Sequence, residues 1–231
     1  MVLLCSPLLS DNVKKIFQDL NYETLCVPPC KGLAYPVRSH PDMLFSALKD
    51  GSLLTDKAYR EDNAEFFSRL EKLTNIRVSE RVLSPEYPND ILFDAARNGD
   101  MLFGRLEYTA PELLSDHPIK KNVKQGYARC STLMLSNGAV SADGGLCDAF
   151  VSCGLDAMRI FGGNITLPGY GYGFIGGASA VLEREKTVVF FGDVTAHPDG
   201  KKITAFCEEH GYKVLYPSGE PLCDHGSVQL I

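Results

Sequence analysis

The sequence predicts an α/β fold in which five ββαβ units close into a pseudo-fivefold ring, a five-bladed α/β propeller. Three observations support this prediction. Short apolar runs joined by turn dipeptides recur along the chain, and stretches with apolar residues three to four apart separate them. The chain also opens and closes on a lone strand pattern. Repetition of this kind is typical of architectures in which each unit buries its apolar face against its neighbours.

Hairpins are predicted wherever an apolar strand, a turn dipeptide and a second apolar strand follow one another. The dipeptides are Asp50-Gly51, Asn98-Gly99 and Asn137-Gly138. Such pairs suit a type I′ turn, because both of its central residues need positive φ. A fourth hairpin is expected over residues 179–191, with a charged turn in place of the glycine.

Helices are expected after the second strand of each hairpin, over residues 60–73, 110–116, 145–153 and 199–210. Gly211 supplies a C-terminal stop for the last one, and Asp143 is an expected N-cap. Further strands are expected over residues 22–27, 76–82, 157–161 and 212–216. The last strand of each unit then starts near one of five positions, Asp42, Asp90, Arg129, Gly177 and Gly226.

The whole chain is predicted to be one domain, residues 1–231, with units at about 1–50, 51–98, 99–137, 138–185 and 186–231. Val2–Cys5 and Ser227–Ile231 have no hairpin partner of their own. If the other hairpins join neighbouring units, these two strands should pair and complete the ring. Closure would hide sheet edges that otherwise invite aggregation.

Composition limits the class of protein. The formal net charge is −6 and no Lys/Arg run forms a stripe, which disfavours a nucleic-acid or anionic-membrane partner. No apolar run reaches the roughly 20 residues that span a bilayer. The eight cysteines form no CxxC pair and no zinc-ligand spacing. We therefore expect a cytoplasmic protein with reduced thiols, without a metal site or a cofactor.

The stretch Ser39-His40-Pro41-Asp42-Met43-Leu44-Phe45 resembles the His-x-Asp segment of the guanidine-modifying penteins, which include arginine and agmatine deiminases, dimethylarginine hydrolases and amidinotransferases. The resemblance covers the whole chain as a repeat pattern and short stretches as motifs. It implies the pentein five-bladed α/β propeller, with His40 as the acid/base and Asp42 gripping a guanidinium. Pro88–Phe93 resembles the region that supplies another substrate-binding acid, here Asp90. The repeat register makes Asp42 and Asp90 equivalent, so that both could bind one planar cation.

Those enzymes carry a nucleophilic cysteine in a glycine-rich segment before the last strand, and the matching segment here contains Cys223. Cys223 lies three residues before Gly226, which occupies the position equivalent to Asp42. A nearby base must lower the pKa of such a thiol. His225 and His40 are the candidate bases, and Asp224 could join the cation clamp.

Residues 171–176 satisfy the GxGxxG pattern. A dinucleotide site needs that run between a strand and a helix, whereas here a strand is expected to follow. Residues 167–177 are instead expected to be a mobile lid carrying tyrosines, with Gly176 and Gly177 leaving room for a ligand. Cys130 occupies the equivalent point of the third unit and could face the same cavity.

Two functions remain open at this point. The first is a thiol-dependent hydrolase or amidinotransferase acting on a guanidino compound, with Cys223, His40 and His225 catalytic and Asp42, Asp90 and Asp224 binding the substrate. The alternative is a non-catalytic pentein, as the ribosome anti-association factors are. Such a ring could bind a small cationic metabolite or a protein partner.

Overall fold

The structure is a computed structural model that describes residues 1–231. It is a mixed α/β fold built on five three-stranded sheets. The sheets are β15-β1-β2 (Val228–Leu230, Val2–Cys5, Glu23–Cys26), β3-β4-β5 (Phe45–Ala47, Leu53–Thr55, Ile76–Val78), β6-β7-β8 (Ala96–Asn98, Met101–Gly104, Ile119–Asn122), β9-β10-β11 (Thr132–Met134, Gly138–Ser141, Asp156–Arg159) and β12-β13-β14 (Ser179–Leu182, Thr187–Phe190, Lys213–Leu215).

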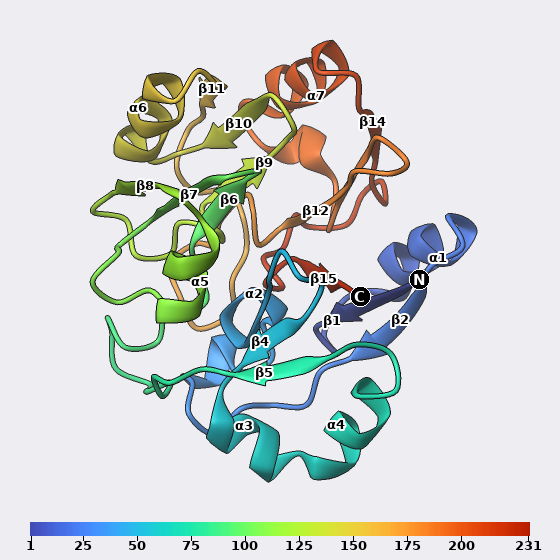
Figure 1. The fold of residues 1–231 in the computed structure, drawn as a ribbon. Coiled ribbons are helices and arrows are strands. Elements are labelled where there is room, and N and C mark those ends of the chain that lie inside the picture. The colour runs from blue at the N-terminus through green and yellow to red at the C-terminus, as the bar shows by residue number, and fades with distance from the viewer.

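Every sheet has the same plan. Its middle strand is antiparallel to the first strand and parallel to the third. A parallel pair needs a crossover, which helices supply here. The crossover helices are α1 (Asp11–Asp19), α3 (Lys57–Asp62) with α4 (Ala64–Leu70), α5 (Pro111–Asp116), α6 (Gly144–Ser152) and α7 (Gly200–Glu209). They lie at the outside of the molecule, while β6, β9, β12 and β15 lie nearer its middle (Figure 1).

Local sequence explains where these helices start. The Ser10 side chain accepts a hydrogen bond from the Val13 N–H at the start of α1, and Asp143 accepts one from Leu146 at the start of α6, as predicted. The helix expected over 60–73 is two helices, because Asn63 leaves the helical region at φ −124° and ψ 41°. Asp56 caps the first of them.

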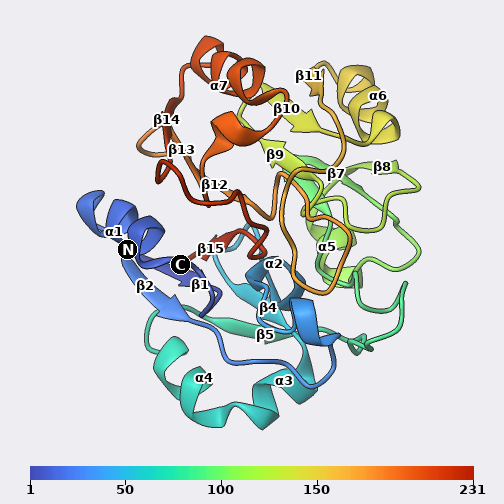
Figure 2. The ribbon, with the colours of Figure 1, turned by 180° about the vertical axis from the view of Figure 1, so that it is seen from behind.

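The first and last strands pair, as the sequence predicts. β1 is antiparallel to β15, with Leu3 opposite Leu230 and Cys5 opposite Val228. The two termini consequently lie close together in both views of the ribbon (Figure 1 and Figure 2).

The segments that lead into the first strands are joined by backbone hydrogen bonds. These bonds are Asp42 N–H to Gly226 C=O (3.1 Å), Arg129 to Asp94 (3.1 Å), Gly177 to Cys130 (2.9 Å) and Ser227 to Gly177 (2.9 Å). The segment before β3 is thus joined to the segment before β15, and the segment before β6 to the one before β9. The segment before β12 is joined both to the one before β9 and to the one before β15. Side chains from distant parts of the sequence therefore meet where these segments converge.

The predicted equivalence of Asp42 and Asp90 is wrong. Asp42 lies in a one-turn helix, α2 (Pro41–Leu44), directly before β3, because Pro41 favours a first helical turn. Asp90 lies in a loop, and β6 begins only at Ala96. The acid that the fold places beside Asp42 is Asp94.

The four hairpins form, but the three with Asp-Gly or Asn-Gly dipeptides do not have the predicted type I′ turn. Asp50, Asn98 and Asn137 all have negative φ. In the first hairpin the Leu48 N–H bonds to the Ser52 carbonyl, and Gly51 ends the intervening three-residue loop at φ +83°. A turn followed by a left-handed residue is the usual solution for a loop of this length.

No helix has the combined length and apolar character needed to cross a membrane. The largest apolar cluster surrounds Phe45, Tyr59 and Phe67, where α3 and α4 cover the β3-β4-β5 sheet. Other clusters lie under α1, around Phe17, under α7, around Ile203, and under α6, around Phe150.

We predict that Gly226→Ala destabilises the protein far more than Gly51→Ala. Both glycines have positive φ, at +74° and +83°, which costs an alanine about 1 kcal/mol or more. A Cβ at Gly226 would also lie 2.3 Å from the Cβ of His40, whereas a Cβ at Gly51 meets nothing within 4 Å. Overpacking should add about 1–3 kcal/mol to the loss for Gly226→Ala. Urea unfolding measures both variants, and equal losses would contradict the close packing of Gly226 on His40.

Candidate functional site

A pocket of about 250 Å³ opens where the segments preceding the first strands converge. Its polar groups come from His40, Cys130 and Asp224. The rest of its lining is apolar or aromatic, with the rings of Tyr127, Tyr170, Tyr172 and Phe174 among them. The pocket thus combines an aromatic wall with a small polar floor, which is the usual composition of a small-molecule site.

Asp224 is held rigidly at this floor. Its carboxylate accepts hydrogen bonds from the backbone N–H of Phe174 (2.8 Å) and of Gly226 (3.0 Å). One carboxylate oxygen lies 3.7 Å from Nδ1 of His40, and both side chains are buried. The end of the chain and its first third therefore supply an acid and an imidazole to the same place.

Behind the floor lies a cluster of Asp42, Asp94 and Cys130, whose ligating atoms are all within 4.8 Å of one another. The Cys130 thiol donates to Oδ2 of Asp42 (2.8 Å), and the Cys130 backbone N–H donates to Oδ1 of Asp94 (2.9 Å). The remaining oxygens, Asp42 Oδ1 and Asp94 Oδ2, are buried and have no hydrogen-bond partner in the protein. Unpartnered buried carboxylate oxygens are costly and mark a place where a ligand can supply the missing donor.

Burial and mutual repulsion weaken the acidity of these groups. Burial, reinforced by the charge of Asp42, raises the pKa of Asp94 to about 8. Burial also raises the pKa of Asp224 to about 6, although the neighbouring His40 opposes the rise. Burial together with Asp42 raises the pKa of the Cys130 thiol well above its ordinary value. The site therefore holds protons that a bound cation could displace.

The two histidines that were predicted to be catalytic, His40 and His225, lie in different surroundings. His40 precedes α2 and lines the pocket. His225 does not line it, and its ring lies 6.4 Å from that of Phe191. Burial, His40 and Lys14 lower the pKa of His225 to about 4, so its imidazole is neutral at physiological pH.

Asp90 is separate from the cluster around Asp42. Its Oδ2 accepts a hydrogen bond from the hydroxyl of Tyr127 (2.6 Å), and Oδ1 is buried without a partner. Burial raises the pKa of Asp90, and the Tyr127 hydrogen bond opposes that rise. Asp90 thus supports an aromatic wall of the pocket through Tyr127.

Cys223 is next to Asp224 but is not part of the pocket lining. It forms an isolated parallel bridge with Thr166, and its N–H donates to the carbonyl of Phe191 (3.0 Å). Burial and the charge of Asp224 raise the pKa of its thiol. The cysteine that lines the pocket with His40 is Cys130.

A side chain at Gly176 or Gly177 would collide with other parts of the protein, so these glycines leave no room for a ligand in the pocket of His40 and Asp224. Gly176 lines a separate cavity instead. A Cβ at Gly177 would lie 2.0 Å from Oδ1 of Asp224, and one at Gly176 would lie 2.4 Å from the carbonyl oxygens of Arg129 and Thr132. These glycines instead admit the Asp224 carboxylate and a neighbouring backbone segment. The 171–176 run leads into strand β12, which is not the setting of a dinucleotide loop.

Asp42, Asp94 and Cys130 are also a conceivable set of metal ligands, with two oxygens and one sulfur. Structural zinc sites use four ligands drawn mainly from cysteine and histidine, and calcium or magnesium prefers an all-oxygen shell. This donor set is therefore incomplete for zinc and too soft for the hard cations.

Sequence reasoning missed Asp94 as a site residue and gave Cys130 only a secondary place. Asp94 interrupts the apolar run Ile91-Leu92-Phe93-Asp94-Ala95, and a charge inside a buried strand pattern is a signal that could have found it. The repeat register, which places Cys130 at the equivalent point of the third unit, was the signal that pointed to it.

The chain belongs to a family described as a family of unknown function (DUF6873), whose model matches residues 4–229. No curated protein matches the chain. No solved structure matches it either.

We predict that the protein loses stability as the pH rises from about 5 to about 9, and that Asp94→Asn reduces this loss. The folded-state pKa values of Asp94 and Asp224, about 8 and about 6, lie above the ordinary aspartate value. Their protonated forms therefore contribute stability that is complete below about pH 4 and is lost as the pH passes through the folded-state values. At the alkaline end Asp94→Asn should melt about 3 °C or more above the wild type.

Asp148→Asn on the exposed face of α6 is the matched control and should keep the wild-type pH dependence. Thermal unfolding followed by circular dichroism across the pH range makes the comparison. Parallel curves for the wild type and Asp94→Asn would contradict the raised pKa of Asp94.

Proposed function

We propose that this member of the DUF6873 family is a pentein-type α/β propeller that binds a small organic cation, a guanidinium or an amine, at the pocket of His40, Cys130 and Asp224. One observation carries the proposal. The buried carboxyl group of Asp224 lines an aromatic pocket together with Cys130, and the buried carboxyl groups of Asp42 and Asp94, each with an unpartnered oxygen, lie directly beside Cys130.

The ring is supported by the repeated plan of the five sheets and by the pairing of β1 with β15. The backbone hydrogen bonds between consecutive first-strand segments support it further. In such a ring the converging segments form one end of a central cavity, which is where the pocket lies.

The charges of the cluster favour a cation. Its one ion-pair contact joins His40 to Asp224, and no lysine or arginine pairs with Asp42 or Asp94. A unit positive charge 4 Å from a carboxylate gains about 4 kcal/mol at an effective dielectric constant near 20. That attraction is enough to offset much of the cost of removing the cation from water.

The lining favours an organic cation over a bare metal ion. Tyr127, Tyr170, Tyr172 and Phe174 present ring faces and edges around the pocket. Aromatic rings attract ammonium and guanidinium groups, with about 0.5–2 kcal/mol for each well-placed ring. A volume of about 250 Å³ also suits a small molecule better than a single ion.

A binding function without thiol chemistry agrees with the protonated state of the Cys130 and Cys223 thiols. A nucleophilic cysteine must be a thiolate, which needs a positive neighbour to lower its pKa. The Cys130 thiol instead donates to the Asp42 carboxylate, and burial raises its pKa. Burial raises the pKa of Cys223 as well.

A thiol-dependent hydrolase or amidinotransferase acting on a guanidino compound is the second candidate. The observation that favours it is that Cys130 and His40 line the same pocket as Asp224. In that function the thiolate of Cys130 or Cys223 would attack the guanidinium carbon, and the C–N bond to the leaving ammonia or amine would break as His40 passes it the proton of the thiol.

We predict that methylguanidine or propylamine binds the wild-type protein and that Asp224→Asn weakens binding at least tenfold, since the amide carries no charge. Isothermal titration calorimetry in two buffers of different ionisation heat measures the affinity and the protons released. Proton release is expected, because a cation lowers the pKa of the protonated acids. Tyr172→Ala, at an exposed ring of the wall, should weaken binding about threefold.

Asp148→Asn is again the control and should bind as the wild type does. Absence of binding by both cations would refute the proposal. Stabilisation by Zn²⁺ or Mg²⁺ alone, lost in Asp42→Asn, would show that the cluster is a metal site instead.

We also predict that iodoacetamide labels Cys130 and Cys223 slowly at about pH 6, because both thiols are protonated there. Peptide mapping by mass spectrometry gives the rate at each cysteine. Rapid labelling of either residue that disappears in His40→Ala would reveal a thiolate paired with His40. That outcome would replace the binding function with the enzymatic one.

A further inference from the structure

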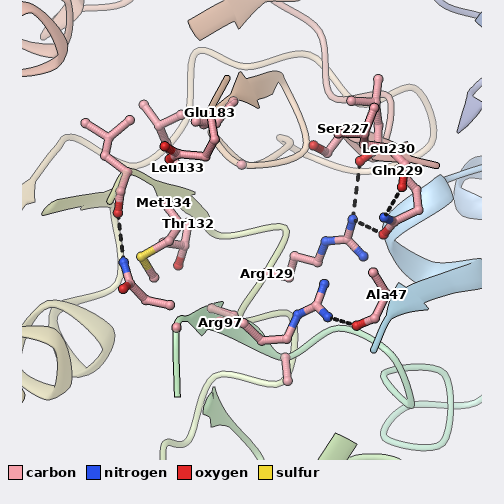
Figure 3. Close-up of a pocket in the computed structure, with 18 of the residues that line it drawn as sticks. Ala47, Arg97, Arg129, Thr132, Leu133, Met134, Glu183, Ser227, Gln229 and Leu230 are labelled. Atoms are coloured by element: carbon pink, nitrogen blue, oxygen red, sulfur yellow. Dashed lines mark hydrogen bonds between the residues drawn. The ribbon is translucent and has the colours of Figure 1, made fainter. Parts of the chain in front are cut away.

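A second cavity, of about 640 Å³, lies between the first strands of the sheets. Its wall includes the strand residues Ala96, Leu133 and Val228 and two arginines, Arg97 and Arg129. Figure 3 shows these two guanidinium groups on the same side of the cavity. None of the polar groups of the pocket described above lines it.

Both guanidinium groups are anchored to backbone carbonyl oxygens. Nη1 of Arg97 donates to Ala47, and Nη1 of Arg129 donates to Phe45 (2.8 Å). Nη2 of Arg129 donates to Val228 (3.3 Å) and to the side-chain oxygen of Gln229 (3.2 Å). These bonds fix the position of both groups but do not neutralise their charge.

The edge of Arg97 formed by Nε and Nη2 has no acceptor, since its only hydrogen bond uses Nη1. This edge is the planar fork that binds a carboxylate or a phosphate with two parallel hydrogen bonds. The hydroxyl of Thr132 is a further unpartnered polar group in the cavity wall.

Arg97 and Arg129 are close enough to repel each other. Burial, together with the charge of Arg129, lowers the pKa of Arg97 to about 9, which leaves it charged at neutral pH. The ion pairs of arginine in this protein involve Arg60 and Arg77 instead. The charge of Asp116, which also lines the cavity, offsets part of this repulsion, but neither arginine forms an ion pair, and a bound anion would relieve the rest.

The acidic groups in the same wall are already engaged. Oδ2 of Asp116 accepts the backbone N–H of Lys49 (2.8 Å). The Glu183 carboxylate accepts hydrogen bonds from Ser136, Lys186 and Tyr212. Lys49, the other cation of the wall, is paired with Asp100, so the two arginines are the cations of the cavity without an ion pair.

We infer that this cavity is an oxyanion-binding site, in which Arg97 and Arg129 hold the carboxylate or phosphate group of a small metabolite. The cavity volume leaves space for the remainder of such a molecule beyond the two guanidinium groups.

Thermal unfolding at constant ionic strength tests the inference, with chloride replaced by inorganic phosphate or by malonate. A ligand that binds only the folded state, near saturation, should raise the melting temperature by about 5 °C. A rise with phosphate alone, malonate alone or both supports the site and tells which oxyanion it prefers. Absence of a rise with either anion overturns the inference.

Arg97→Gln should abolish the rise, because it removes the free fork. Arg97→Lys keeps the charge without the fork and should retain part of the rise. Arg69→Gln, at an exposed arginine of α4, is the control and should keep the full rise. A full rise in Arg97→Gln would overturn the assignment.

The wild-type protein gives a second measurement that does not depend on how the variants fold. In NMR spectra, the side-chain Nε–H signal of Arg97 should shift on titration with the anion that stabilises the protein. An unshifted signal at saturation would also overturn the assignment.

Discussion

The pairing of β1 with β15 is the constraint on which the arrangement of this molecule depends. The chain starts with the middle strand of a sheet, and that sheet is complete only when the last strand of the chain joins it. The loop so closed is almost the whole protein, so the pairing must offset the entropic cost of closing a long loop. Closure brings Gly226 next to the segment before β3. Gly226 packs against His40 there, and the Asp42 N–H donates to the Gly226 carbonyl.

The candidate cation site follows from the same closure. His40 and Asp224 are near opposite ends of the sequence and meet only because the terminal strands share a sheet. Burying acids here is unfavourable in itself. Backbone donors offset part of the cost, as the N–H groups of Cys130 and Phe174 do for Asp94 and Asp224. The oxygens that remain unpartnered are those that a ligand can satisfy.

The repeated unit could be predicted from the sequence because it depends on local patterns. Apolar period, a glycine stop and caps such as Asp143 predicted α5, α6 and α7 near their observed bounds, while α1 was not predicted and the helix expected over 60–73 is two helices. The lone terminal strands predicted their own pairing. The site was harder to predict, because a shift of one residue in strand register moves a side chain to the opposite face of the sheet. The short helix α2 and the longer loop before β6 shift that register, so Asp94 rather than Asp90 lies beside Asp42.

The same dependence of side-chain direction on the preceding loop explains why Cys130 lines the pocket and Cys223 does not. Both precede a first strand, but the turn at residues 129–131 directs Cys130 into the pocket, while Cys223 lies along Thr166. A motif match fixes the unit in which a residue lies, and the loop geometry within that unit decides which way its side chain faces. Sequence repeats carry the first kind of information and only weakly the second.

Arg129 and Cys130 are consecutive residues, yet each lines a different cavity. One peptide therefore connects the two proposed sites. Burial raises the pKa of Asp94, and the positive charge of Arg129 opposes that rise. An anion bound at Arg129 would screen this charge and raise the pKa of Asp94 further, and its own negative charge would attract a cation bound beside Asp94. Because coupling free energy between two sites is reciprocal, a cation beside Asp94 would strengthen binding of the anion to the same extent. The two sites, if both are occupied in the same molecule, are thus coupled through a single guanidinium.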